Sequence, residues 1–285
     1  MLRRICLLLV SWATAARVGP AAAMRPATAC NTLVLTTYLK TVHDWQNQGA
    51  KHERPQELIK NFRDSILRTP GVKSIVLHDS LDKSYTHSAT VQNKFTFEKV
   101  DPAAHDSLLG VNDVRFLLFR EALQRHSDVE VVFTTDLFDV EVLQNPCHLV
   151  YKDPHLLYVG SEVSNTLSCD WLKQRFADMG GKYAKWYEAA VQRDTNKKLF
   201  NAGIIGGTRA HYLPFLDTMI QVLQDPELAS RKLNKQINVN MAALNYVVHS
   251  NHTLLAHVFT GHPLHSLFKG YAALPQDYFK HKFLL

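Results

Sequence analysis

Two aspartates, Asp136 and Asp139, directly follow an apolar run in the stretch VVFTTDLFDVEV. If the chain turns at the two residues between them, both carboxylates can converge on one point instead of facing opposite sides of a strand. Converging acids repel, which raises the pKa of one of them unless a cation lies between the two. Mn²⁺ or Mg²⁺ would suit such a pair, because hard divalent ions take oxygen ligands and are commonly shared with substrate phosphates. The spacing therefore indicates a candidate divalent-metal site.

A purely structural arrangement also accounts for the two acids. Asp139 would cap a turn, and Asp136 would pair with an Arg or Lys, because an ionised carboxylate is expensive to bury without a partner. The two acids alone leave both arrangements open, so the elements around them have to be considered.

The expected strands and helices alternate along the first 160 residues. Apolar runs predict strands over 31–38, 73–78, 94–100, 129–135 and 155–160, and a 3.6-residue period predicts helices over 55–68, 112–126 (capped by Asn112 or Asp113), 210–223 and 238–248. This order predicts an α/β fold with a mostly parallel central sheet and helices on both faces. Ligands of such sheets bind beyond the carboxyl ends of the strands, which is where Asp136 and Asp139 lie.

The segment 161–198 is the least regular part of the pattern. It contains Trp171, Trp186 and two tyrosines, and we expect a long irregular connection there. Long connections inside compact domains usually carry function or move.

Several segments together resemble the GT-A fold glycosyltransferases. TTDLFDV after a buried strand is similar to the Asp-x-Asp type metal motif of that family, in an Asp-x-x-Asp form. Further similar segments follow in the family's order, namely NDVRF at 112–116, LYVGSE at 157–162, LFNAGIIGG at 199–207, NVNMAALNYV at 238–247 and TGHPLHSLFKGY at 260–271. The resemblance covers about 31–272. It implies one Rossmann-like GT-A domain over 31–285 that transfers a hexosyl or pentosyl group from a nucleotide sugar, expected to be a UDP-sugar, to a glycan, protein or lipid acceptor.

The resemblance assigns a metal-binding role to three residues. Asp136 and Asp139 would hold Mn²⁺ or Mg²⁺, and His265 would complete the ligand set, with His262 as the second choice for that position. A metal ion at this place would neutralise the negative charge that develops on a nucleoside diphosphate leaving group.

The resemblance also implies donor-binding residues. The candidates are Thr36, Thr37 and Tyr38 beside the base, Asp113 and Arg115 near the sugar or diphosphate, Asn201 and Gly203 near the sugar, and Lys269 at the diphosphate. Each has an ordinary structural alternative: Tyr38 as a core residue, Asp113 as a helix cap, Arg115 and Lys269 as exposed cations, and Gly203 as part of a tight turn.

One departure from the family concerns the catalytic base. Related enzymes often carry an Asp before the late helix, and this chain has Asn238 and Asn240, whose amides cannot act as a general base. If transfer inverts the configuration, Glu162 or Asp170 is the candidate base, and if it retains the configuration, no such base is needed.

Two other functions remain open. A catalytically inactive sugar- or nucleotide-sugar-binding protein of the same fold would account for Asn238 and Asn240. A metal-dependent phosphohydrolase would require further acids or histidines near the motif, and 140–150 offers only Glu141 and His148.

The N-terminus has the layout of a secretory signal peptide. The basic MLRR, the apolar ICLLLVSWATAA and the small-residue GPAAAM follow one another, which predicts a signal over 1–23, with a boundary as late as 29. The apolar part is short for a bilayer span, so no stable membrane span is expected after its removal. We therefore expect the ER or Golgi lumen, or secretion. A mitochondrial presequence is the alternative, because the first 25 residues are rich in Arg and lack acids.

The remaining composition is that of a globular chain. After removal of Cys6 with the signal, Cys30, Cys147 and Cys169 allow at most one disulfide and leave one thiol. The one N-glycosylation sequon begins at Asn251 and would lie on the surface. The net charge of +6 is scattered along the chain, which gives little support to nucleic-acid binding.

Overall fold

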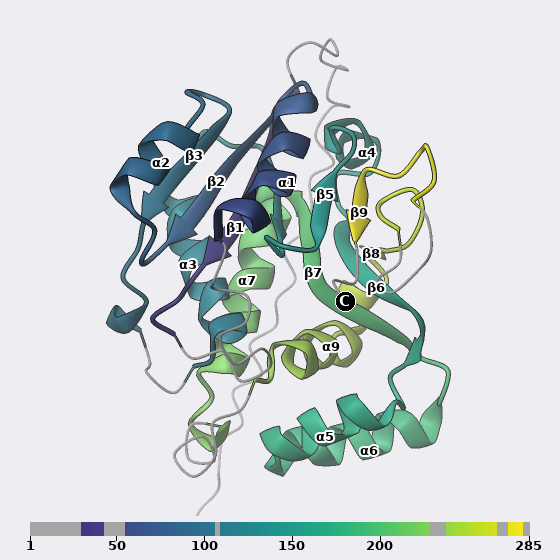
Figure 1. Cartoon of the computed structure of the whole chain (residues 1–285). Coiled ribbons are helices and arrows are strands. Elements are labelled where there is room, and N and C mark those ends of the chain that lie inside the picture. The colour runs from purple at the N-terminus through teal and green to yellow at the C-terminus, as the bar shows by residue number, and fades with distance from the viewer. Residues whose placement is uncertain (1–29, 43–54, 106–108, 229–237, 267–272, 282–285) are drawn as a thin grey trace, which may run out of the picture.

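A seven-stranded sheet in the order β3-β2-β1-β4-β7-β6-β8 forms the centre of the computed structural model, which describes residues 30–42, 55–105, 109–228, 238–266 and 273–281 (Figure 1). A second sheet pairs β5 with β9. The strands are β1 (Thr32–Tyr38), β2 (Val72–His78), β3 (Phe95–Lys99), β4 (Val131–Thr135), β5 (Val140–Val142), β6 (Leu157–Thr166), β7 (Lys198–Thr208), β8 (Val258–Phe259) and β9 (Phe279–His281).

The larger sheet is mostly parallel, as the sequence predicts. Four of its six neighbouring pairs are parallel (β3–β2, β2–β1, β1–β4 and β6–β8), and β7 runs antiparallel to both β4 and β6. The chain builds outward from β1 to β3 and then returns to place β4 on the other side of β1. The strand order therefore reverses between β1 and β4, and the crevice beyond the carboxyl ends of these two strands is where open α/β sheets bind ligands.

Two separate cores confirm that helices cover both faces. On β1, Leu33 and Leu35 point into one core and Val34 points into the other, as strand alternation requires. The first core also contains side chains of α3, α5, α6, α7 and α9, and the second contains those of α1, α4, β5 and β9. The helices are α1 (Pro55–Arg68), α2 (Lys83–Ala89), the 3₁₀ turn η3 (Pro102–Ala104), α3 (Val111–Arg125), α4 (Cys147–Lys152), α5 (Asp170–Met179), α6 (Gly181–Arg193), α7 (Arg209–Leu223), α9 (Asn240–Ser250) and α10 (His252–Leu255).

The expected cap of α3 is wrong. The helix begins at Val111, with Gly110 at the N-cap, so Asn112 and Asp113 both lie inside its first turn. Asp113 is fully buried, and its carboxylate accepts a hydrogen bond from the backbone N–H of Val239, 3.2 Å away. This acid therefore links α3 to the chain before α9 instead of capping its own helix.

The expectation of an irregular segment over 161–198 is also wrong. Strand β6 continues to Thr166, and two helices, α5 and α6, follow. Leu172, Phe176 and Met179 are fully buried on one face of α5, and the ring of Phe176 stacks on Tyr187 of α6 with the centroids 4.7 Å apart. The apolar spacing i, i+4, i+7 is that of an amphipathic helix.

A disulfide joins Cys30, just before β1, to Cys147, the first residue of α4. The Cα atoms are 5.9 Å apart, a separation usual for disulfide-bonded cysteines. Cys169 keeps its thiol, so the prediction of one disulfide and one remaining cysteine is confirmed for the described residues.

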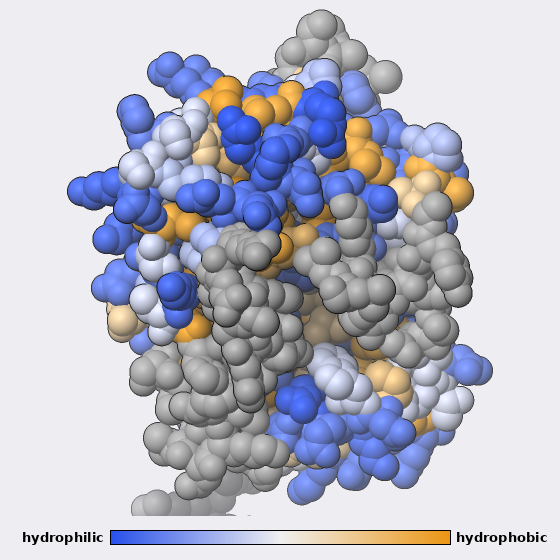
Figure 2. All heavy atoms as spheres, in the orientation of Figure 1, coloured by the Kyte–Doolittle hydropathy of each residue, from blue (hydrophilic) through white to orange (hydrophobic). Residues whose placement is uncertain are grey.

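The described residues on the face shown in Figure 2 are mainly hydrophilic. The face in Figure 2 carries hydrophilic residues over α1, α2, α5 and α6, and its hydrophobic residues lie in small separate areas. Of the helices in the described ranges, none combines the length and apolar character needed to cross a membrane. The expected signal peptide over 1–23 lies outside the described residues, so it stays a prediction.

Candidate active site

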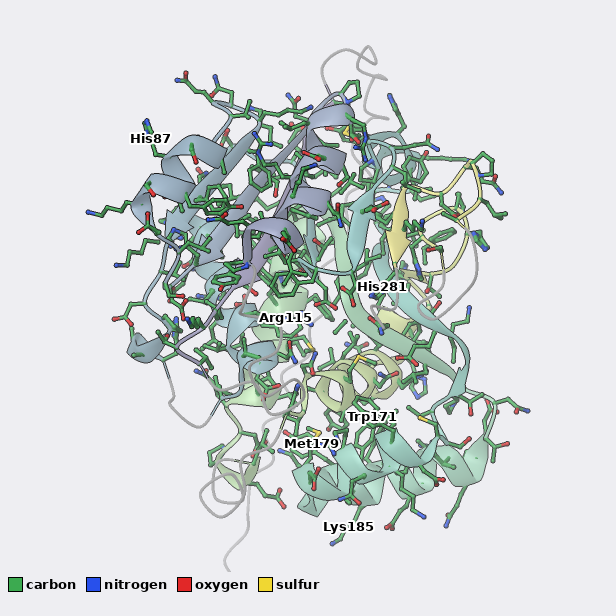
Figure 3. All side chains as sticks on the ribbon, in the orientation of Figure 1. His87, Arg115, Trp171, Met179, Lys185 and His281 are labelled. Carbon is green, nitrogen blue, oxygen red and sulfur yellow. A yellow bond between two sulfur atoms is a disulfide. The ribbon has the colours of Figure 1, made fainter. Side chains whose placement is uncertain are left out.

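Asp136, Asp139 and His281 form a cluster in which one potential ligand atom from each residue lies within 4.8 Å of the others. Asp136 directly follows β4, and Asp139 directly precedes β5. Because β5 and β9 pair antiparallel with Val140 opposite His281, the imidazole is brought beside the acids from the far end of the sequence. Figure 3 shows His281 near the middle of the molecule, below β9.

The turn between the two acids is held by its own side chains. Leu137 is buried in the second core, and the ring of Phe138 meets Tyr38 edge-on, with the centroids 6.3 Å apart. The chain therefore bends after β4, and the two carboxylates come close to each other.

Gly203 of β7 gives the cluster the space it occupies. A Cβ atom at this position would lie 2.5 Å from Cε1 of His281 and 2.7 Å from Oδ2 of Asp136. The carbonyl of Gly203 also accepts the backbone N–H of Asp136 at 2.9 Å. The absence of a side chain thus lets β7 hold the backbone of Asp136 while the imidazole and the carboxylate pack against it.

Substituting Gly203 by Ala is expected to lower divalent-metal affinity by about 10- to 100-fold, the range typical of disturbed outer-shell groups. The added methyl must displace the His281 ring or the Asp136 carboxylate. Calorimetric titration with Mn²⁺ measures the effect. A second glycine of β7, Gly206, cannot serve as the control, because the Cβ of Gly206→Ala would lie 2.4 Å from the ring of Phe133. Ala202→Gly, at the neighbouring residue of β7, is the suitable control. Unchanged Mn²⁺ affinity in folded Gly203→Ala would contradict the packing role assigned to Gly203.

The donor atoms of the cluster fit a divalent transition metal. Two carboxylates supply oxygen, and the fully buried His281 supplies an imidazole nitrogen. Burial lowers the pKa of His281 to about 3, although the charge of Asp136 acts in the opposite direction. The ring is therefore neutral near pH 7, which is the form that binds metals. Carboxylate oxygens suit Mn²⁺ and Mg²⁺, and an imidazole nitrogen is a common ligand of first-row transition metals, so the set combines both kinds of donor.

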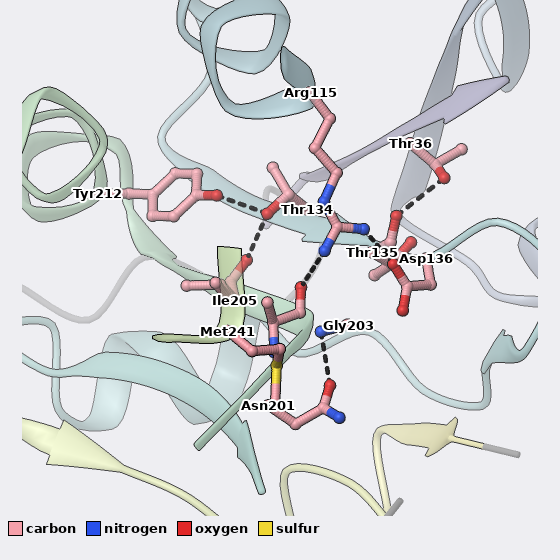
Figure 4. Close-up of polar contacts among 11 residues, drawn as sticks. Thr36, Arg115, Thr134, Thr135, Asp136, Asn201, Gly203, Ile205, Tyr212 and Met241 are labelled. Carbon is pink, nitrogen blue, oxygen red and sulfur yellow. Dashed lines mark hydrogen bonds and ion pairs between the residues drawn. The ribbon is translucent and has the colours of Figure 1, made fainter. Parts of the chain in front are cut away.

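Arg115 of α3 pairs with Asp136 (Figure 4). The ion pair uses Oδ1 of the carboxylate, whereas Oδ2 is the oxygen beside Gly203. Arg115 is buried, and its Nη2 also donates to the carbonyl of Ala202 at 3.2 Å. The sequence left open whether Asp136 pairs with an Arg or belongs to a metal-type cluster. Both arrangements are observed, because Oδ1 faces Arg115 and Oδ2 faces Gly203.

Strand β7 pairs with β4 only from Ile204 onward. In the part of β7 before Ile204, side chains of α9 form hydrogen bonds with the strand backbone. Phe200 donates its N–H to Oδ1 of Asn245 at 3.0 Å and accepts Nδ2–H of the same residue at 2.9 Å. The N–H of Ala202 donates to the sulfur of Met241 at 3.2 Å, so α9 replaces a strand partner here (Figure 4). The backbone on both sides of Asn201 is therefore fixed.

Asn201 lies between β6 and the cluster. Its Oδ1 accepts the N–H of Gly203 at 2.7 Å, and its Nδ2 donates to Oε1 of Glu162 at 3.2 Å. The side chain is buried, with 7% of the residue exposed. Asn201 thus joins Glu162, a candidate base, to the glycine that packs on the Asp136–Asp139–His281 cluster.

The third member of the cluster is His281, not the expected His265 or His262. His265 is fully buried, its Nδ1–H donates to the carbonyl of Ser266 at 2.6 Å, and its Nε2 accepts the N–H of Ser161 at 3.1 Å. Both ring nitrogens are therefore in use, and no lone pair is left for a metal. His262 contacts the buried Asp277 through Nδ1 at 2.6 Å.

His265 has a positioning role instead. Ser266, whose carbonyl binds His265, also accepts the N–H of His281 through its hydroxyl at 2.9 Å. His265 thereby connects β6, at Ser161, to the segment that carries His281.

The buried imidazole of His265 predicts a loss of stability in acid. Burial lowers its pKa from 6.5 to about 4, so the unfolded chain binds the proton more tightly. The neutral His265 ring therefore contributes to the free energy of unfolding above pH 6.5. This contribution, about 3 kcal/mol, is lost as the pH falls from 6.5 toward 4. Urea unfolding across pH 7 to 4 should show a shallower decline for His265→Gln, whose amide oxygen can still accept the Ser161 N–H. Equal slopes for the two proteins would contradict this account.

The other predicted residues occupy varied positions. Thr36 is buried and donates to the carbonyl of Thr135 at 2.8 Å, which ties β1 to β4. Tyr38 is buried at the end of β1, and Thr37 is partly exposed. Asp170 is exposed at the start of α5, whereas Glu162 lies beside Asn201. Asn238 and Asn240 are both buried where α9 begins, and Lys269 lies outside the described residues.

Comparisons with known proteins assign no family. No protein-family model matches the chain, and no curated protein matches its sequence. One solved structure that matches is the crystal structure of the galactosyltransferase LgtC in complex with donor and acceptor sugar analogs. It is 12% identical, with 88% of this chain and 86% of that chain covered and a TM-score of 0.49. At this identity and score, the likeness does not assign an activity to the chain.

Proposed function

We propose that this chain is a metal-dependent glycosyltransferase that uses a nucleotide sugar, with a UDP-sugar as the donor. The observation that carries the proposal is the Asp136–Asp139–His281 cluster at the carboxyl end of β4. It lies at the reversal of strand order between β1 and β4, where sheets of this kind bind ligands. The order of the similar sequence segments, from 112–116 to 260–271, supports the same function.

In this proposal, Asp136, Asp139 and His281 hold Mn²⁺, which supplies charge neutralisation for the diphosphate leaving group. Arg115 fixes the Asp136 carboxylate through its Oδ1 and brings a buried positive charge to the same place. Tyr38, at the end of β1, and Phe138 meet edge-on beside the turn that carries the two acids, and we place the base next to these rings.

Asn201 and Glu162 are the residues we assign to the sugar. Their side chains are hydrogen-bonded to each other beside Gly203, so a sugar bound next to the diphosphate would lie within reach of both. Glu162 is the better candidate base if configuration inverts, because it is hydrogen-bonded to Asn201 beside the cluster, whereas Asp170 is exposed at the start of α5. Replacing Asn201 with an apolar residue would remove the amide N–H that donates to the Glu162 carboxylate.

A luminal location is part of the proposal. The Cys30–Cys147 disulfide is typical of oxidising compartments. Asn251 of the sequon is exposed, and it caps α10 through Oδ1, which accepts the N–H of Leu254 at 3.0 Å and leaves its amide nitrogen available for a glycan. When the chain is expressed in a secreting cell, a glycosidase-sensitive mass that disappears in Asn251→Gln would support entry into the lumen.

Binding of a panel of nucleotide sugars, with and without Mn²⁺, tests the function. We expect metal-dependent binding of UDP-sugars and turnover of the bound donor. Asp139→Asn should lose both, and Asp128→Asn, an exposed acid, serves as the matched control. Absence of metal-dependent nucleotide binding in the oxidised protein would refute the proposal, and binding without turnover would favour the inactive sugar-binding alternative.

A further inference from the structure

Three strand ends meet at the edge of the sheet opposite the candidate active site. Leu157, the first residue of β6, pairs with Gly207 of β7 and with Val258 of β8. The N–H of Leu157 also donates to the carbonyl of His257 at 2.8 Å. Strands β6 and β8 lie side by side in Figure 1. The residues just outside these pairs therefore come together on one part of the surface.

Three histidines lie at this junction. His155 precedes β6, His211 is in the first turn of α7 directly after β7, and His257 precedes β8. The rings of His155 and His211 meet at 80° with their centroids 5.5 Å apart, and all three residues are exposed. Three separate segments thus present imidazoles to the same region of solvent.

Hydrogen bonds fix the tautomer of two of these rings. The hydroxyl of Thr208 donates to the carbonyl of Pro154 at 3.2 Å, so its oxygen accepts Nδ1–H of His211 at 2.8 Å. The Nδ1–H of His257 donates to the carbonyl of Thr253 at 2.7 Å. In both neutral rings the lone pair is therefore on Nε2. Metal-binding histidines are held in this way, with the second nitrogen donating to an oxygen of the protein.

The electrostatic setting keeps His211 in the metal-binding form. Although the residue is exposed, the partial desolvation of its ring and the neighbouring imidazoles of His155 and His257 lower the pKa of His211. The ring also lies at the N-terminal end of α7, where the helix dipole disfavours a positive charge.

We propose that His155, His211 and His257 form a surface site for a divalent transition metal ion of the Zn²⁺ class, independent of the proposed sugar transfer. Three imidazole nitrogens suit Zn²⁺, Cu²⁺ or Ni²⁺ and not Mg²⁺ or Ca²⁺, which require oxygen ligands. Among the described residues, only the Asp136 cluster already has three ligand atoms within 4.8 Å, so binding here requires the exposed side chain of His155 to turn toward the Nε2 atoms of His211 and His257, whose Nδ1–H bonds are kept. The bound ion would connect the short edge strand β8 to β6 and α7.

Zinc titration of metal-free full-length protein tests this site. The Asp139→Asn variant removes a ligand of the other cluster, so the zinc it still binds reports the histidines. We expect one ion per chain in this background and at least about a tenfold loss of affinity on adding His211→Gln. Adding His87→Gln instead, at an exposed histidine on α2 (Figure 3), should change nothing.

Two further measurements keep the test decisive if Asp139→Asn does not fold. The wild type should bind two zinc ions and His211→Gln one, by calorimetry. Zinc should also raise the unfolding midpoint of the wild type by more than that of His211→Gln, because an ion that binds the folded state stabilises it. Equal zinc affinity and stoichiometry with and without His211→Gln would overturn the proposal.

Discussion

Replacing His281 with Gln should lower Mn²⁺ affinity by at least about 100-fold, more than a change in the outer shell of a metal site. His281 supplies the nitrogen donor of the cluster, and the substitution leaves both carboxylates in place. With the ion lost, sugar transfer should fall by about a thousandfold, since the charge stabilisation that a metal supplies is worth several kcal/mol. Mn²⁺ binding, followed by calorimetry or electron paramagnetic resonance, is measured separately from turnover.

Two other histidines provide matched controls. His265→Gln removes a buried imidazole whose nitrogens bind Ser161 and Ser266, and His262→Gln removes an exposed one that contacts Asp277. His262→Gln should keep most of the Mn²⁺ affinity, and His265→Gln, which alters only the support of His281, should lose much less than His281→Gln. The reverse result, with affinity retained in His281→Gln and lost in His265→Gln, would restore His265 as the ligand and refute the cluster.

The acids of this site could be predicted from the sequence, but the imidazole could not. Asp136 and Asp139 follow an apolar run, and two neighbouring carboxylates at a strand end favour a cation near them, either a metal ion or a basic side chain. His281 depends on pairing between β5 and β9, two strands of three residues each that lie about 140 positions apart in the chain. Such short strands carry little periodicity, and the register that places His281 opposite Val140 is set by tertiary packing.

The same contrast appears in the fold. Helix α1 matches its predicted bounds because its apolar period is strong and Pro70-Gly71 follows it. Helices α5 and α6 were not predicted, although Leu172, Phe176 and Met179 carry a helical spacing, because the polar and aromatic residues between them obscure it. The support of β7 by Asn245 and Met241 has no local signal, since both residues read as ordinary positions of a helix.

The disulfide is expected to contribute the largest single increment of stability. Cys30 and Cys147 are 117 positions apart, and closing a loop of this size in the unfolded chain is worth about 3–5 kcal/mol in the chain-entropy model. Cys147→Ser and chemical reduction should therefore lower the free energy of unfolding by similar amounts, measured by urea denaturation. Cys169→Ser, at the remaining thiol, should change it by less than about 0.5 kcal/mol.

The losses of stability from the two single substitutions should not add, because replacing either cysteine already removes the disulfide. Cys30→Ser, Cys147→Ser and the double variant are expected to unfold at the same urea concentration. The folded junction itself should persist, since Asn145 also joins these segments: it accepts the hydroxyl of Thr32 at 2.7 Å and donates to the carbonyl of Cys30 at 3.1 Å. Mn²⁺ affinity of the folded reduced protein should therefore stay close to that of the oxidised protein. A large drop in affinity on reduction would instead show that the disulfide holds β5, and with it Asp139, in the position the metal requires.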